Sequence, residues 1–329
     1  MCPTSSLRRV LASIFLLSAS IFGMAQTNET RPFEEQAVTV AIPGAELHGS
    51  LLLPTGVRRP PVALIIAGSG PTDRDGNNAG MKNNSLKMLA FALKDQGIAS
   101  LRFDKFGVGA SATVHIPEDS LRFEDFVAHV SAWIAFLSEQ RLGPLYLVGH
   151  SEGSLLAILA AQQHPKQIRG LVSIAGSGLP IGDVLREQLQ EHPPGLLVPA
   201  LAHIAKLESG QRIDSIHPFL YALFRPSVQP YLISWMAYDP SKELQKLECP
   251  LLLVQGTHDL QVPTHHLDSL LSAAPAARSL RMDGMNHVLN TAPLDRALNF
   301  KSYSDPTLPL AQGLSEGIGQ FILDTSSRR

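Results

Sequence analysis

Short apolar runs alternate with amphipathic segments along the first half of the chain. The segments Ser85–Gln96 and Phe123–Gln140 place apolar residues three and four positions apart, which predicts helices. The apolar runs are short and nearly continuous, as in strands that are buried on both faces of a parallel sheet. They are Val62–Ala67, Ile98–Phe103, Leu145–Val148 and Ile168–Ala175. This alternation predicts an α/β fold with a mostly parallel, doubly wound sheet.

The two ends of the chain extend this pattern. Ala37–Ile42 and Leu47–Leu53 flank the turn residues Pro43–Glu46, which predicts an antiparallel hairpin before the parallel strands. The second half adds two strands and two helices, which we expect at Leu251–Gln255, Pro263–Ala274, Arg278–Met282 and Leu308–Ile322.

The pattern changes between the two halves. Residues 179–246 contain amphipathic helical segments and no clear strand. We therefore predict a helical cap (179–246) inserted between strands of a core formed by residues 26–178 and 247–329. The helical segments are expected to be broken at Pro193, Pro194, Pro199, Pro218, Pro226, Pro230 and Pro240.

Composition and charge narrow the class of protein. With 44% hydrophobic and 17% charged residues, the chain is typical of a globular protein with a substantial core. The net charge of −2 and the lack of a long basic run argue against nucleic acid as a partner. No cofactor or metal is expected, and the sequence does not predict the oligomeric state.

The first 25 residues have the features of a signal peptide. Arg8 and Arg9 precede the apolar run 10–22, and Gly23-Met24-Ala25 supplies small residues for cleavage. We expect export to the periplasm or the extracellular space without stable membrane insertion after cleavage; an uncleaved anchor is the alternative. Cys249 would be the only cysteine of the mature chain, and we interpret it as a small buried hydrophobe rather than a reactive thiol.

One stretch carries a chemical motif. Gly149-His150-Ser151-Glu152-Gly153 lies between an apolar strand and a helix of small residues. G-x-S-x-G in this context is typical of a nucleophile elbow, a sharp turn that presents the serine above the sheet. The glycines are needed because side chains there would collide with the neighbouring strand and helix.

A serine hydroxyl needs a histidine to accept its proton, and the histidine needs a carboxylate to orient it. Asp259 follows the strand after the cap, and His287 follows the last strand. Other candidates for the acid are weaker, because Asp268 falls inside a predicted helix and Asp283 is too close to His287 on the same loop. His258 adjoins the acid, and His265 and His266 are expected at a solvated helix start, with no spacing that pairs them with a further metal ligand.

The three loops GHSEG, GTHD followed by Val262-Pro263, and GMNH resemble the catalytic loops of the α/β-hydrolase superfamily over nearly the whole mature chain. The resemblance implies an α/β-hydrolase fold with Ser151 as nucleophile, Asp259 as acid and His287 as base. It also implies an oxyanion hole formed by the backbone N–H groups of Ser69 and Glu152. Ala67 replaces a histidine that relatives carry before that loop. The segment GSGPTDRDGN resembles bacterial esterases, secreted or cytosolic, related to dienelactone hydrolases and serine aminopeptidases.

The expected activity is hydrolysis of a small-molecule carboxylic ester, with a small or medium acyl group, through an acyl-enzyme intermediate. One alternative is a serine aminopeptidase, which needs an acidic anchor for the substrate amine. Candidate anchors are Glu152, Glu187, Glu191 and Glu208. The alternative outside enzymes is a hydrolase-like binding protein.

Several roles stay open from the sequence. Glu152 is either an acid at a helix N-terminus or a polar wall of the acyl pocket. Asp73, Arg74 and Asp75 either bind substrate or brace their loop through Arg102 or Asp104. Five cap aromatics and one methionine are expected mostly in the core of the cap, with one or two lining the pocket, and they are Phe219, Tyr221, Phe224, Trp235, Tyr238 and Met236.

Overall fold

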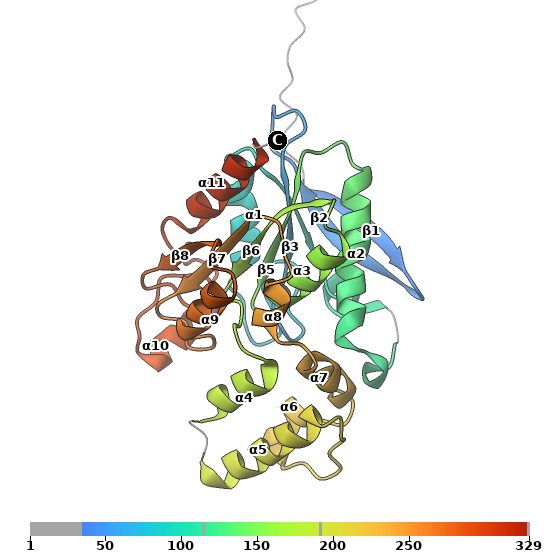
Figure 1. The fold of residues 1–329 in the computed structure, drawn as a ribbon, viewed down its shortest axis with the longest axis vertical. Coiled ribbons are helices and arrows are strands. Elements are labelled where there is room, and N and C mark those ends of the chain that lie inside the picture. Colours follow the sequence, from blue (N-terminus) through green and yellow to red (C-terminus); the bar gives the residue numbers. More distant parts are fainter. Residues whose placement is uncertain (1–34, 114–115, 191–192, 328–329) are drawn as a thin grey trace, which may run out of the picture. The chain divides into compact units, whose positions relative to one another are not determined.

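An eight-stranded sheet organises the chain in the computed structural model, which describes residues 35–113, 116–190 and 193–327 (Figure 1). The predicted signal peptide, 1–25, lies outside these ranges. The strand order is β1-β2-β4-β3-β5-β6-β7-β8, with β1 and β2 antiparallel to their neighbours and the other strands parallel. The strands are β1 Gln36–Ile42, β2 Ala45–Leu52, β3 Val62–Ile66, β4 Ala99–Phe103, β5 Leu145–His150, β6 Ile168–Ile174, β7 Leu251–Gly256 and β8 Arg278–Met282.

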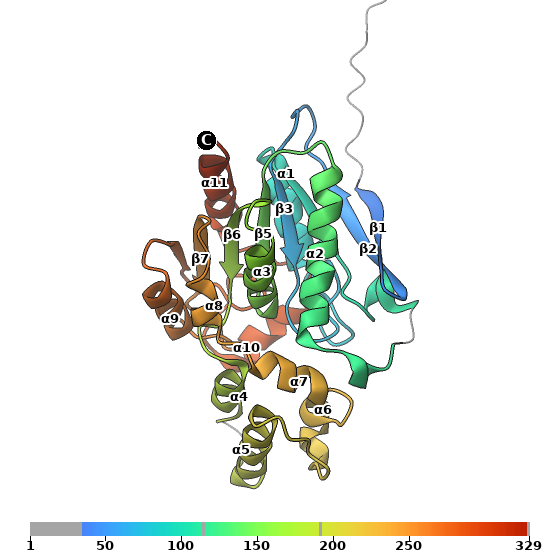
Figure 2. The ribbon, with the colours of Figure 1, turned by 45° about the vertical axis from the view of Figure 1, so that its right-hand side comes forward.

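Helices cover both faces of this sheet (Figure 2). Side chains alternate along each strand, so Val62 and Leu64 of β3 join one core cluster and Ala63 and Ile65 join the other. The first cluster includes α2 (Phe123–Glu139), α3 (Glu152–Gln163) and α9 (His265–Ala273), and the second includes α1 (Ser85–Asp95) and α11 (Leu314–Ser326). The predicted doubly wound α/β architecture is therefore confirmed.

Helices α4 to α8 lie between β6 and β7 in the chain (Figure 1). Helices α4 to α7 form a separate apolar cluster, whereas α8 joins the first core cluster through Leu244. Prolines begin helices here rather than only breaking them, because a proline at the first turn loses no helical hydrogen bond. Pro199, expected as a break, lies inside α5, which corrects that expectation. The helices are α4 Ile181–Leu189, α5 Pro194–Glu208, α6 Tyr221–Phe224, α7 Gln229–Met236 and α8 Pro240–Leu244, with a 3₁₀ turn at Pro218–Leu220.

The closing helix differs from the expected range. It was expected at Leu308–Ile322, but α11 begins at Leu314, after Gly313 in the left-handed conformation (φ 86°). The carbonyls of Leu308 and Pro309 accept hydrogen bonds from the Asn290 side chain, so these residues are held in a loop. A short helix that the sequence did not predict, α10 (Arg296–Lys301), precedes this loop.

No helix among the described residues is long and apolar enough to span a membrane.

Candidate active site

Ser151 occupies a strained turn between β5 and α3. Its backbone has φ 55° and ψ −121°, a conformation that L-residues with side chains rarely adopt. Its N–H donates to the carbonyl of Ile174 at 2.9 Å, which ties the turn to the neighbouring strand. Strain of this kind persists where the surrounding structure fixes it, and it is concentrated at functional sites. The backbone geometry is therefore that of the predicted nucleophile elbow.

The two glycines of the motif pack without room for a side chain. A Cβ on Gly149 would lie 2.2 Å from the carbonyl oxygen of Gly153. A Cβ on Gly153 would lie 2.3 Å from the carbonyl oxygen of Ile66 in β3. Both contacts are with backbone atoms, so the helix cannot approach the sheet this closely unless both residues are glycine.

Gly153→Ala is expected to destabilise the protein by about 1–3 kcal/mol, because the methyl group forces α3 away from β3. The matched control is Gly195→Ala in α5, where a Cβ meets nothing within 4 Å and the expected change is neutral or slightly stabilising. Urea unfolding followed by circular dichroism measures both. Equal stabilities for the two variants would contradict the close packing at the elbow.

Asp259 and His287 form a buried hydrogen-bonded pair. The Nδ1–H of His287 donates to Asp259 Oδ2 at 2.8 Å, and the N–H groups of Gln261 and Val262 donate to Oδ1 at 2.8 and 2.9 Å. Burial alone would raise the pKa of Asp259, but the charge of His287 and these hydrogen bonds outweigh it and lower the pKa. The carboxylate therefore stays ionised and orients the imidazole, so that Nε2 is left to accept a proton.

The loop that carries His287 is fixed by buried polar groups. His150 Nε2–H donates to the His287 carbonyl at 2.8 Å, and burial lowers the pKa of His150 to about 4, so this ring stays neutral. Asn286 donates to Ser302 Oγ at 2.7 Å and accepts from the N–H of Val288 at 3.2 Å. His150 thus packs beneath the elbow, as expected, and also positions the histidine loop.

The serine and the histidine are neighbours without a direct hydrogen bond. The rings of His150 and His287 have centroids 4.9 Å apart, and Ser151 directly follows His150. Within the described part of the chain, the Ser151 hydroxyl has no hydrogen-bond partner. In free enzymes this contact is often long and closes only when substrate is bound. The structure thus brings the Asp259–His287 pair to the elbow that presents Ser151; their catalytic roles stay predictions.

The loop after β3 passes directly over Ser151. A Cβ on Gly68 would lie 3.1 Å from Ser151 Cβ, a tight contact that the glycine avoids. Among the described hydrogen bonds, the N–H groups of Ser69 and Glu152 have no partner. The Ser69 carbonyl accepts from Thr72 Oγ1 at 2.9 Å, which fixes the loop from its far side. Two backbone donors are thus available beside the nucleophile, as an oxyanion hole requires.

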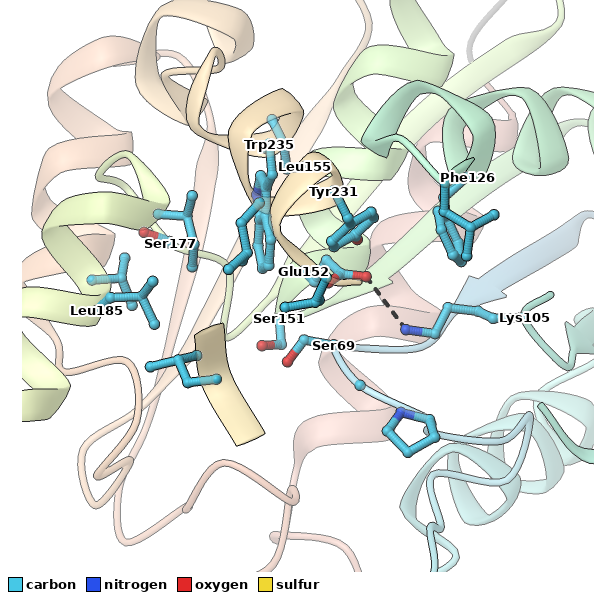
Figure 3. A pocket seen from close by; sticks show the side chains of 18 of the residues that line it. Ser69, Lys105, Phe126, Ser151, Glu152, Leu155, Ser177, Leu185, Tyr231 and Trp235 are labelled. Carbon is cyan, nitrogen blue, oxygen red and sulfur yellow. Dashed lines mark hydrogen bonds and ion pairs between the residues drawn. The ribbon is translucent and has the colours of Figure 1, made fainter. Parts of the chain in front are cut away.

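Lys105, which sequence reasoning did not single out, holds this region together (Figure 3). It follows β4, and its ammonium group donates to the carbonyl of Gly68 and lies 3.3 Å from Glu152 Oε1. The side chains of Lys105 and Glu152 are 4% and 2% exposed. Both interpretations of Glu152 therefore hold, because it is the first residue of α3 and also forms a buried ion pair in the wall of the pocket. Lys105 could have been identified from the sequence by its position at the carboxyl end of a parallel strand, where ligands bind in such sheets.

Above Ser151 lies a mostly apolar cavity of about 670 Å³ between the sheet and helices α4 to α8 (Figure 3). Trp235 lines it, as expected for one or two cap aromatics, and so does Tyr231, which the sequence analysis missed. Burial, and then the nearby Glu152 carboxylate, raise the pKa of Tyr231 well above its usual value. The leucines, valines and isoleucines of the wall are Val108, Ile116, Leu121, Leu155, Leu179, Ile181, Val184, Leu185, Leu223, Val228, Leu232 and Val262.

The other cap aromatics divide between core and surface. Phe224 is fully buried in the cap cluster, which agrees with core filling. Phe219 is 82% exposed and Tyr221 is 53% exposed, so core filling is wrong for these two. Helical spacing alone could not separate them, because it does not identify which face meets the core.

The charged residues Asp73, Arg74 and Asp75 of the loop after β3 are held by ion pairs and hydrogen bonds, as one of the two interpretations proposed. Arg74 pairs with the buried Asp104 at 2.7 Å, and Arg102 pairs with Asp75 and Glu35. Asp73 accepts hydrogen bonds from backbone N–H groups of its own loop. None of these side chains lines the cavity, so the loop supports the site from outside.

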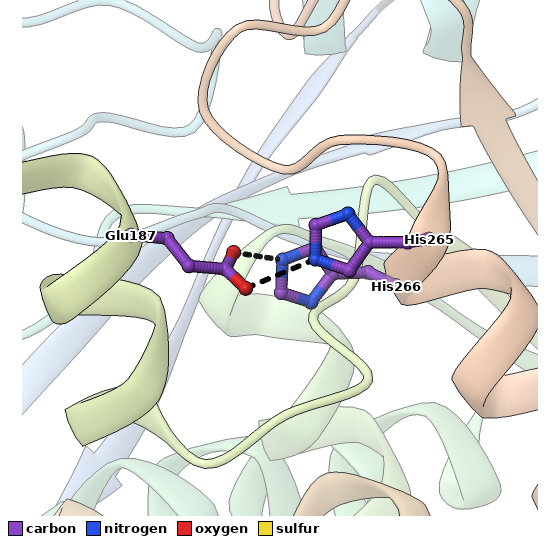
Figure 4. Close-up of side chains that lie close together, drawn as sticks. All are labelled: Glu187, His265 and His266. Atoms are coloured by element: carbon purple, nitrogen blue, oxygen red, sulfur yellow. Dashed lines mark hydrogen bonds and ion pairs between the residues drawn. The ribbon is translucent and has the colours of Figure 1, made fainter. Parts of the chain in front are cut away.

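His265 and His266 do not form a solvated pair. His266 is fully buried, which corrects that expectation, and both rings contact Glu187 of α4 (Figure 4). The sequence offered no partner for them because Glu187 belongs to the distant cap segment. The rival acids have other contacts: Asp268 pairs with Arg281, and Asp283 accepts from Thr257 Oγ1.

Comparisons with known proteins agree with this geometry. A family model described as "Serine aminopeptidase, S33" matches residues 79–197. Esterase EstD from Thermotoga maritima is 25% identical over 262 residues, covering 78% of this chain and 60% of the relative, so the chain spans about 60% of the length of that curated protein.

Solved structures show the same fold. Est1E from Butyrivibrio proteoclasticus has a TM-score of 0.61 at 17% identity, with 89% of this chain and 99% of that one covered. Proline iminopeptidase from Mycobacterium smegmatis has a TM-score of 0.57 at 15% identity, covering 88% and 99%. The sheet, the elbow and these likenesses define an α/β-hydrolase fold.

Proposed function

We propose that the protein is a carboxylic ester hydrolase that uses Ser151 as its nucleophile and forms an acyl-enzyme intermediate. The observation that carries the proposal is the strained Ser151 turn at the mouth of an apolar cavity, beside the buried Asp259–His287 pair. The curated relative is named an esterase, and a thermophilic esterase from Thermogutta terrifontis is among the structures that share the fold.

In the proposed reaction His287 Nε2 takes the proton of the Ser151 hydroxyl while its oxygen attacks the ester carbonyl. The N–H groups of Ser69 and Glu152 hold the negative oxygen of the tetrahedral intermediate. The intermediate collapses, His287 returns the proton to the leaving alcohol, and the acyl group stays on Ser151. Water, deprotonated by the same histidine, then releases the acid and restores the serine.

The charges around the cavity favour an ester over a peptide with a free amino terminus. An aminopeptidase needs an unpaired carboxylate to bind the substrate ammonium group. Among the expected anchors, Glu152 is paired with Lys105, Glu208 with Arg186, and Glu187 contacts both histidines. Glu191 lies outside the described residues. The apolar wall around Trp235 and Leu185 suits a small or medium acyl chain.

A substrate panel tests this preference. We expect kcat/KM on p-nitrophenyl acetate and butyrate to exceed that on aminoacyl p-nitroanilides at least tenfold, because a buried ammonium without a charged partner costs about 1.5–3 kcal/mol. Higher activity on the anilides would favour the aminopeptidase. Saturable binding of an ester without turnover would favour the binding-protein alternative.

Export to the periplasm or the extracellular space is part of the proposal and rests on residues 1–25. Cell fractionation with N-terminal sequencing of the mature protein tests it. We expect a chain that begins after Ala25 in the exported fraction, and a full-length chain retained in the cytoplasm would contradict it.

A further inference from the structure

Glu187, His265 and His266 bring three metal-binding side chains together at the boundary between the cap segment and the core (Figure 4). Glu187 comes from α4, and the two histidines are the first residues of α9. His265 Nε2 and His266 Nε2 each lie 3.0 Å from a different oxygen of the Glu187 carboxylate. All the potential ligand atoms lie within 4.8 Å of one another.

The donor geometry suits a transition metal. Zinc binds imidazole nitrogens and carboxylate oxygens at about 2.0–2.2 Å, which places tetrahedral donor atoms about 3.3 Å apart. The 3.0 Å separations here need only a slight opening of the cluster to admit an ion. The histidine rings are tilted by 31° with centroids 4.4 Å apart, and both Nε2 atoms contact the same carboxylate.

His266 is oriented before any ion arrives. It is fully buried, its Nδ1 accepts a hydrogen bond from the N–H of Gly178 at 3.2 Å, and Ser177 Oγ lies 3.2 Å from the same atom. The ring proton is therefore on Nε2, which donates to Glu187. Metal binding at Nε2 moves this proton to Nδ1, where the hydroxyl oxygen of Ser177 can accept it in place of the contact with Gly178. A polar partner on the far nitrogen is the usual support of a metal-binding histidine.

We propose that Glu187, His265 and His266 form a binding site for a divalent transition metal, with Zn²⁺ the best fit to this nitrogen and oxygen donor set. The side chains of His265 and Glu187 are 51% and 37% exposed, which gives an ion a route of entry and leaves room for water to complete its coordination.

Metal binding at this site connects α4 to α9. Glu187 is followed by Gln188, which lines the substrate cavity and donates to the carbonyl of Gln261 at 3.0 Å. None of the three proposed ligands lines that cavity among the described residues. The ion therefore acts on the position of the cap helix rather than on the reacting atoms, and the site is independent of the proposed ester hydrolysis.

Titration calorimetry with ZnCl₂ tests the site on the mature protein in a non-chelating buffer. We expect one saturable site per chain in the wild type and at least about a tenfold weaker affinity in Glu187→Gln and His265→Ala. Glu187→Gln keeps the shape and much of the hydrogen bonding, so it tests the ligand rather than the fold. The matched control is His48→Ala, because His48 lies 3.6 Å from Glu46 and no third ligand lies near them among the residues that the structure describes. The affinity of this variant should equal that of the wild type.

Thermal unfolding gives a second readout. Excess Zn²⁺ should raise the melting temperature of the wild type by about 5 °C, because it binds only the folded chain, and should raise that of Glu187→Gln by clearly less, because the affinity of this variant is weaker. The proposal is overturned if the wild type shows no saturable binding. It is also overturned if Glu187→Gln binds as tightly as the wild type, or if His48→Ala loses affinity as the ligand variants do.

Discussion

Ser151→Ala is expected to lower kcat/KM on p-nitrophenyl butyrate by a factor on the order of 10⁴–10⁶, because removal of the nucleophile leaves only substrate binding and the oxyanion donors. The backbone N–H groups of Ser69 and Glu152 are unaffected by this change. The alanine has the same positive φ as the serine, so we expect the free energy of unfolding to stay within about 0.5 kcal/mol of the wild type.

The control is Ser272→Ala, which removes an exposed hydroxyl of α9 that bonds only to the Asp268 carbonyl. It should retain full activity. If Ser151→Ala hydrolyses the ester at the wild-type rate while folded, the proposed mechanism is wrong.

Lys105→Met is expected to destabilise the protein by about 3–5 kcal/mol, because it leaves the Glu152 carboxylate buried without its cation. It also removes the donor to the Gly68 carbonyl, so the loop that carries the Ser69 N–H loses its support and activity should fall with stability. Urea unfolding followed by circular dichroism measures the first effect, and ester hydrolysis well below the unfolding transition measures the second.

Two further variants separate charge from packing. Lys105→Met with Glu152→Gln removes both charges and should recover most of the stability, though not the contact with Gly68. Lys246→Met breaks a 2.6 Å pair in which the lysine is 57% exposed, and it should cost less than about 1 kcal/mol, because Lys246 lies in solvent. If Lys105→Met lowers the free energy of unfolding as little as Lys246→Met does, the buried Lys105–Glu152 pair does not contribute the stability assigned to it.

Local patterns predicted the sheet and the elbow because both depend on nearby residues. Buried parallel strands require continuous apolar runs, and Val62–Ile66 and Leu145–His150 lie close to where those runs predict them. The glycines around Ser151 are forced by contacts with the adjoining strand and helix, so the motif itself encodes the turn. Asp259 and His287 could be chosen because each follows a strand of the same sheet edge.

The features that the sequence analysis did not predict depend on contacts between segments that are distant in the chain. Lys105 meets Glu152 only because β4 and β5 both flank β3 in the sheet. Tyr231 reaches the cavity because of the way α7 packs, which periodicity does not specify. Likewise, the burial of His266 follows from Gly178 and the cap helix packing against it, so a sequence pattern alone suggested a solvated position.

Covalent labelling followed by mass spectrometry tests the central claim most directly. The protein is incubated with diethyl p-nitrophenyl phosphate, which phosphorylates activated serines, and then digested and sequenced by tandem mass spectrometry. The account predicts one diethylphosphoryl group per chain on Ser151, loss of ester hydrolysis in proportion to labelling, and no label in Ser151→Ala. Ester hydrolysis that survives complete exposure to the reagent, or a label on another residue with Ser151 unmodified, would contradict it.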